Sequence, residues 1–259
     1  MRLCTSVLLA LCFVAATPQP ALPPDSKLPA GPEPLRERDP ARSILYTGRG
    51  NDLVAAGQFA AALEQFHRAI ACDPLNANPL INEAYALDRL GRYELALAVI
   101  KRAQPLAPED PTLYLNWGNT LINLGRFKDA LEPLVRATEL APSNHQAQVD
   151  LAVSYSRLER PADANAALGK AVQLLLAQAL GYGQENNRDK ALGCYREIIR
   201  LAPQFLPAYV NAAILLEQLG RIDEAIGMLE AALKIAPHET ALLESLQKLR
   251  QRKAAAAGP

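Results

Sequence analysis

Few residues in this chain have the type and spacing needed for catalysis or metal binding. The three histidines, His67, His145 and His238, stand in separate parts of the sequence, and no set of Cys, His and carboxylate residues has the spacing of a metal site. The segment Gly181-Tyr182-Gly183 lacks the lysine and the preceding strand of a phosphate-binding loop. We therefore predict a protein that is not an enzyme and that holds no metal ion or cofactor.

The charge and cysteine content exclude two further classes. The 27 basic residues are balanced by 27 acidic ones and form no basic stripe, so nucleic-acid binding is not predicted. Cys72 and Cys194 lie too far apart in a repetitive chain to form a disulfide, and their positions are typical of small buried residues near helix ends. Two unpaired thiols are unusual for a protein of an oxidising compartment.

A regular spacing of prolines indicates an internal repeat. Pro74, Pro108 and Pro142 are 34 residues apart, as are Pro203 and Pro237. Four of the units have a glycine near the middle and an aromatic residue or Ile two positions later, and small residues recur at two positions in the following stretch. The glycines are Gly57, Gly91, Gly125 and Gly220, and the next column is Phe59, Tyr93, Phe127 and Ile222. The small residues are Ala62, Ala96, Ala130, Ala164, Ala191 and Ala225, followed by Ala69, Ala103, Ala137, Ala171 and Ala232.

These columns predict two helices in each unit. A glycine can adopt the left-handed conformation that stops the first helix, and the proline cannot extend the second. The alanines fall where two helices would cross closely, because a larger side chain would push the helices apart. The larger apolar residues recur three and four positions apart, which is the spacing of one helical face.

This pattern resembles the tetratricopeptide repeat family. The third unit carries the resemblance most fully, with Tyr114, Trp117-Gly118, Leu121, Gly125, Phe127, Ala130, Leu134, Ala137 and Pro142. The resemblance covers roughly residues 43–239. It implies an all-α fold, a right-handed superhelical α-solenoid of about six helix-turn-helix units followed by a C-terminal capping helix.

The unit boundaries follow from the spacing, with one irregularity. We expect units near 43–76, 77–110, 111–144, 145–171, 172–205 and 206–239, a capping helix over 240–253 and a disordered tail over 254–259. The fourth unit is seven residues short, because Pro142 and Pro203 are 61 residues apart. No helix breaker appears there before Gly181 and Gly183, so two helices are either fused or joined by a tight turn. The junction over 171–184 is either a hinge or a compressed rigid connection.

Two positions depart from the repeat pattern. In the fourth unit Glu159 stands in place of the usual glycine, so we expect this turn to adopt another conformation. Pro133 lies inside the expected second helix of the third unit and should kink it.

The N-terminal region has features of an exported chain. Arg2 precedes an apolar run from Leu3 to Ala16, which is typical of a signal peptide over residues 1–16 and is short for a membrane span. We therefore expect the chain to be exported, with a periplasmic location; the alternatives are an apolar segment retained as a membrane anchor and a cytoplasmic chain with an apolar start. Eight prolines in residues 17–42 predict an extended linker.

Polar residues recur along the expected first helices. Positions six, nine and thirteen of the units, which we call the first-helix polar residues, are Asn51, Asn82, Tyr85, Arg89, Asn116, Asn119, Asn123, Asp150, Arg157, Asn211 and Gln218. Asn is a middling helix former, and its amide can pair with an extended peptide backbone. The family resemblance implies that first helices line the concave groove. Asn82, Asn116 and Asn211 are similar to the asparagine ladder of O-GlcNAc transferase arrays, which hold extended peptides.

The predicted function is a scaffold or adaptor that binds a protein or peptide segment in this groove. The carboxylate clamp of chaperone-binding relatives is not expected, because Thr47, Thr112 and Asn116 stand where the clamp has basic residues. By analogy, exported arrays serve envelope, secretion or pilus assembly. The alternatives are an accessory subunit that positions an enzyme and a self-assembling homo-oligomer. The self-assembly surface would be formed by Ile81, Leu115, Ile122 and Ile214.

Overall fold

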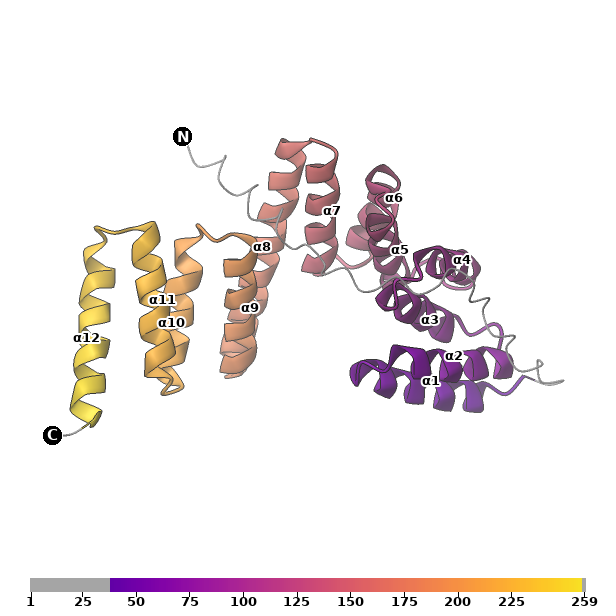
Figure 1. The fold of residues 1–259 in the computed structure, drawn as a ribbon, viewed down its shortest axis with the longest axis horizontal. Helices are drawn as coiled ribbons and strands as arrows, with labels where there is room; N and C mark the ends of the chain where they lie inside the picture. Colours follow the sequence, from indigo (N-terminus) through magenta and orange to yellow (C-terminus); the bar gives the residue numbers. More distant parts are fainter. Residues whose placement is uncertain (1–37, 258–259) are drawn as a thin grey trace. The chain divides into compact units, whose positions relative to one another are not determined.

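The protein's structure is a computed structural model that describes residues 38–257 (Figure 1). These residues contain twelve α-helices and no strand, which confirms the all-α repeat fold. The predicted signal peptide and residues 17–37 of the predicted linker lie outside the described residues. The chain forms two compact bodies, one within residues 16–164 and one within residues 165–259.

The first body consists of antiparallel helix pairs. Its helices are α1 (Pro40–Ala55), α2 (Phe59–Cys72), α3 (Ala77–Arg89), α4 (Tyr93–Ala103), α5 (Pro111–Asn123), α6 (Phe127–Leu140) and α7 (His145–Arg157). The odd-numbered helices are the first helices of their units and the even-numbered ones are the second. α1 begins inside the predicted linker, because Pro40 occupies its first turn and Asp39 caps it by accepting from the Arg42 N–H.

α8 (Pro161–Gln184) is one continuous helix of 24 residues that begins in the first body and belongs mostly to the second. The fused alternative is therefore the one found. α8 combines the second helix of the shortened fourth unit with the first helix of the fifth, so six units and a cap need only twelve helices. Gly181 and Gly183, the first helix breakers in this stretch, lie within α8, which ends at Gln184.

The second body continues with three more repeat helices and a C-terminal helix. These are α9 (Arg188–Leu201), α10 (Leu206–Gln218), α11 (Ile222–Ile235) and α12 (Thr240–Ala257). α12 packs against α11 and buries Leu242, Leu246 and Leu249, as a capping helix should. It continues through Ala257, so the tail predicted from residue 254 is helical over 254–257. Among the described helices, none combines the length and apolarity required to cross a membrane.

The turn between the two helices of a unit has the same geometry six times. A backbone N–H just after each turn donates to a carbonyl five residues earlier at 2.8–2.9 Å, as in a Schellman motif. The six donors are Gln58, Arg92, Arg126, Arg160, Asn187 and Arg221. Glycine occupies the left-handed position four times, with φ of 72–74°, while Glu159 (φ 56°) and Asn186 (φ 57°) occupy it in the other two. The expectation of another conformation at Glu159 is therefore wrong: tertiary packing holds the same turn with a less suitable residue.

Close helix contact explains the columns of small residues. Ala62, Ala96 and Ala130 at the first column are fully buried. Gly118 on α5 faces Leu134 on α6 so closely that an added Cβ would overlap the Leu134 side chain, and Gly50 faces Phe66 in the same way. Pro133 lies within α6, which runs unbroken from Phe127 to Leu140; the kink predicted there stays a prediction.

The packing of the first body is asymmetric. First helices of neighbouring units contact each other, α1 with α3, α3 with α5 and α5 with α7. Among the described helices of this body, the extensive contacts of α2, α4 and α6 are with helices adjacent to them in the chain. Because first helices approach one another and second helices do not, the first helices line the inner face of this body and the second helices its outer face.

Replacing Gly118 with alanine should destabilise the first body. The added methyl group has no room beside Leu134, so we expect the free energy of unfolding to fall by about 1–3 kcal/mol. Gly169→Ala is the matched control, because a Cβ at this helical position in α8 meets nothing within 4 Å. It should be neutral or stabilise by up to about 1 kcal/mol. Urea unfolding followed by circular dichroism measures both, and an equal effect of the two substitutions would contradict the close contact.

Candidate functional site

The first-helix polar residues lie on helices that the fold places next to one another. Those of the first body are on α1, α3, α5 and α7, and Asn211 and Gln218 are on α10 of the second body. Most are half-buried or exposed, and Asp150 is buried. In the first body, the contacts of α1 with α3, α3 with α5 and α5 with α7 bring these positions together on the inner face.

Amide side chains link successive first helices. Asn82 Nδ2 on α3 donates to Asn51 Oδ1 on α1 at 2.8 Å. Asn116 Nδ2 on α5 donates to the backbone carbonyl of Ile81 on α3 at 3.3 Å. Each bond uses one donor of an amide group that has two donors and one carbonyl oxygen. These bonds leave Asn82 Oδ1, Asn116 Oδ1 and Asn51 Nδ2 to face a ligand.

Residues at position thirteen of the units, near the ends of the first helices, contact the preceding unit. The Arg89 guanidinium lies 5.0 Å from the centre of the Phe59 ring, and that of Arg157 lies 5.8 Å from the Phe127 ring. In both pairs the arginine is at the end of a first helix and the aromatic residue begins the second helix of the preceding unit. The second body has the same arrangement: Arg188, which begins the second helix α9, donates through its Nε to Oε1 of Gln218, at the end of the next first helix α10, at 3.2 Å. These side chains therefore have structural partners.

Tyr85 and Asn123 belong to the same face. The Tyr85 hydroxyl accepts from Arg89 at 3.0 Å, and its ring meets Phe59 edge to face. Asn123 Nδ2 donates to both carboxylate oxygens of Asp88, at 3.1 and 3.0 Å. Burial raises the pKa of Asp88, and the hydrogen bonds from Asn123 and Thr120 lower it in part.

Asp150 is a buried carboxylate between α5 and α7. Its Oδ1 accepts from Gln146 Nε2 at 2.9 Å, and it also bonds to Asn119. Burial raises the pKa of Asp150 to about 6, against the lowering effect of these two hydrogen bonds. Among the described residues, no side chain or backbone group bonds to its Oδ2 atom. The face therefore contains a buried acceptor at the position where two other units have Asn82 and Asn116.

In the second body, Asn211 bonds to the Tyr195 side chain. Burial raises the pKa of Tyr195, and this hydrogen bond opposes the rise. The row of first-helix polar residues is interrupted between the bodies because α8 has Ala177 at the corresponding place.

Three other expectations concern residues off this face. Ile81 is only 3% exposed, which removes it from the apolar surface predicted for self-assembly, whereas Ile214 is 47% exposed. His67 packs against the buried Glu83 with 3.0 Å between Nε2 and Oε1, so it is a packing residue. Cys72 and Cys194 are buried free thiols, as predicted.

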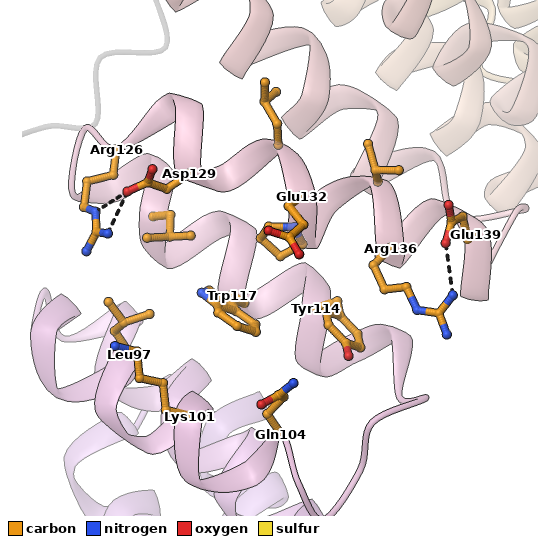
Figure 2. A pocket seen from close by; sticks show the side chains of 14 residues that line it. Leu97, Lys101, Gln104, Tyr114, Trp117, Arg126, Asp129, Glu132, Arg136 and Glu139 are labelled. Atoms are coloured by element: carbon orange, nitrogen blue, oxygen red, sulfur yellow. Dashed lines mark hydrogen bonds and ion pairs between the residues drawn. The ribbon is translucent and has the colours of Figure 1, made fainter.

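Sequence reasoning missed a cleft on the outer face of the first body, floored by Tyr114 and Trp117 (Figure 2). Both residues were assigned only to the repeat pattern. The available signal was Pro105, which lies within the stretch expected to form the second helix of its unit.

Comparison with known families decides the classification. Two family models, both described as tetratricopeptide repeat, match residues 47–111 and 115–174 in one case and residues 184–249 in the other. The chain belongs to the tetratricopeptide repeat family. Proteins of this family are generally non-enzymatic and commonly mediate binding to proteins or peptides.

Several solved structures of tetratricopeptide repeat proteins resemble the chain. YrrB, described as having an unusual peptide-binding site, is 20% identical, with a TM-score of 0.42 over 79% of this chain and 92% of YrrB. MamA from Desulfovibrio magneticus is 18% identical, with a TM-score of 0.45 over 76% of this chain and 97% of MamA. The first repeat domain of Spaghetti (RPAP3), bound to an HSP90 peptide, is 23% identical, with a TM-score of 0.46 over 47% of this chain and 97% of that domain. A search of curated proteins gives no significant match.

The buried Asp150 should make stability depend on pH. Its raised pKa means that the folded state keeps this proton up to about pH 6, while the unfolded state loses it near pH 3.8. Its contribution to the free energy of unfolding is therefore largest below about pH 4, falls as the pH rises, and stays low above about pH 6. Asp150→Asn removes the charge, so it should stabilise the protein by about 1–3 kcal/mol at about pH 8 and much less at about pH 4.

Denaturant unfolding of the parent and of Asp150→Asn at both pH values measures this effect. Asp52→Asn, on the exposed surface of α1, is the control and should change stability by less than about 0.5 kcal/mol at either pH. A gain from Asp150→Asn that does not depend on pH would show that the carboxylate does not titrate as described.

Proposed function

We propose that this repeat protein is a non-enzymatic scaffold that holds an extended peptide segment of a partner against the first-helix polar residues of its first body. The observation that carries the proposal is the row of amide side chains on the inner face. Asn51, Asn82 and Asn116 are fixed by hydrogen bonds between first helices and keep donors and acceptors for a ligand. Fixed side chains lose little conformational entropy on binding.

The spacing of the helices suits an extended peptide. Neighbouring helices pack about 8–10 Å apart, and an extended chain advances about 3.3 Å per residue. Each unit would therefore meet the peptide once in about three residues. A peptide backbone offers an N–H and a C=O at each residue, and an Asn side chain can pair with either. Pairing of Asn side chains with backbone groups favours recognition of the peptide backbone, so the affinity should depend only modestly on the peptide's sequence.

The charges on this face indicate which peptide groups would be accepted. Arg89 and Arg157 lie over aromatic rings and join units, so they are positioning residues for the face. The buried carboxylate of Asp150 lies beneath this face, and its negative charge disfavours a second carboxylate nearby. A segment with a free acidic C-terminus is therefore a poor ligand, in agreement with the missing clamp cations.

The export of the chain and a role in envelope, secretion or pilus assembly also belong to this proposal. They are supported by the apolar run from Leu3 to Ala16 and by the proline-rich stretch after it. If the signal peptide is cleaved, the chain recovered from its native host will begin at or near Thr17 and will be found outside the cytoplasm. N-terminal mass spectrometry of the native protein measures this, and a chain that retains Met1 in the cytoplasmic fraction would overturn it.

Selection from a display library of random linear peptides tests the binding face. Peptides selected on the full chain should bind the double variant Asn82→Ala/Asn116→Ala at least about fivefold more weakly, because two hydrogen bonds of about 0.5–1.5 kcal/mol each are lost. Gln65→Ala is the matched control, since it removes an amide from the second helix α2. Thermal unfolding of both variants checks that the fold is intact. Equal binding by parent and double variant would place recognition elsewhere.

A further inference from the structure

A second surface of the first body has the shape of a ligand site. A cleft of about 830 Å³ lies on the outer face between α4 and α6, with α5 as its floor (Figure 2). In Figure 2, Leu97, Lys101 and Gln104 form one side, and Tyr114 and Trp117 lie at the centre. The other side carries Arg126, Asp129, Glu132, Arg136 and Glu139.

The cleft exists because α4 is short. α4 has 11 residues, whereas the equivalent helices α2 and α6 have 14. Pro105 has no N–H to continue the helix, so α4 ends at Ala103. Where the last turn is missing, Tyr114 and Trp117 on the outer side of α5 are partly exposed.

The floor of the cleft is a flat aromatic surface. The rings of Tyr114 and Trp117 stack with their centres 6.2 Å apart and their planes 16° apart. The Tyr114 hydroxyl donates to the backbone carbonyl of Pro108 at 3.0 Å, which fixes its ring. Tyr209 in the second body donates to Pro203 in the same way, but the residue three positions later is the buried Ala212. Among the described units, the stacked pair is thus a feature of the third one.

Six charged residues line the cleft, and four of them are paired with each other; the other two, Lys101 and Glu132, have opposite charges and stand on opposite sides. Arg126 bonds to Asp129 at 2.6 Å, and Arg136 bonds to Glu139 at 3.0 Å, both within α6. Apart from Glu132, the lining between these pairs is apolar and aromatic, from Leu97, Trp117, Leu121, Leu131, Pro133 and Val135. Such a surface suits an uncharged segment with flat apolar rings, because proline rings in a polyproline II helix pack on aromatic side chains at low entropic cost.

We propose that residues 17–24 of this same chain bind in the cleft. Their sequence, Thr-Pro-Gln-Pro-Ala-Leu-Pro-Pro, contains four prolines and no charged residue. Pro20 and Pro23 are three positions apart, which is one turn of a polyproline II helix, so both rings face the same side. The later part of the proline-rich stretch is less suitable, because residues 25–37 carry both acidic and basic residues.

The segment can reach the cleft. Arg38, the first described residue, is held at the carboxyl end of α2, with its Nε 2.7 Å from Asp73 Oδ1. α2, α4 and α6 are the second helices of successive units, so their carboxyl ends, and with them Gln104 and Glu139, lie along one edge of the body. Residues 25–37 span about 40 Å when extended at about 3.1 Å per residue. The cleft lies about three helix spacings from α2, each about 10 Å.

Fluorescence quenching of Trp117, the single tryptophan of the chain, tests the proposal in the full-length protein. The docked segment covers its ring, so acrylamide should quench the variant Pro20→Ser/Pro23→Ser/Pro24→Ser at least about twofold more than the parent. Pro29→Ser/Pro32→Ser/Pro34→Ser is the matched control and should behave like the parent. A synthetic peptide of residues 17–24, added to the first variant, should restore the protection.

Two results would overturn the proposal. Equal quenching of the parent and both variants would show that the segment does not cover Trp117. Protection that disappears on dilution would show that the covering segment comes from a second copy of the chain. Neither result bears on peptide binding to Asn82 and Asn116, which lie on the inner face and are tested by separate variants.

Discussion

The close contact between the two helices of each unit is the constraint on which the rest of this structure depends. Gly118 against Leu134 and Gly50 against Phe66 leave no space for a side chain, and the alanines of the repeat columns are buried at the same crossings. This contact fixes how each unit presents its first helix to the next unit. The positions of the polar side chains on the inner face are therefore a consequence of apolar packing between helices.

The same side chains serve the fold and the proposed site. Asn82 connects α3 to α1 and Arg89 connects α3 to the start of α2, so each holds neighbouring units in register. An arginine over an aromatic ring gives up little of its hydration, because its head group stays exposed. Asp150 differs, since its carboxylate is buried and one oxygen has no partner among the described residues. A buried acceptor of this kind costs stability, and such a cost is found more often at functional positions than at purely structural ones.

The sequence predicts the repeat fold well because each repeated column has one local cause. Gly57, Ala62 and Pro74 are examples, and each is explained by a turn, a crossing or a helix end. The failures arise where packing overrides a local preference. Glu159 adopts the left-handed conformation that glycine prefers, and Gly181 and Gly183 remain helical because α8 continues through them. The face of the first-helix polar residues was predictable from periodicity, but their partners were not, since those depend on contacts between residues about 30 positions apart.

The outer cleft follows from the curvature of the first body together with one proline. When first helices approach one another, the second helices separate, so each junction on the outer face is a potential opening. At the junction between α2 and α4, the residues of α3 that correspond to Tyr114 and Trp117 are Leu80 and Glu83, and both are buried. There the full-length α2 covers them, and His67 bonds to Glu83. At the next junction Pro105 shortens the covering helix, and aromatic rings stand where α3 has Leu80 and Glu83, which leaves the cleft in which we propose that an apolar segment binds.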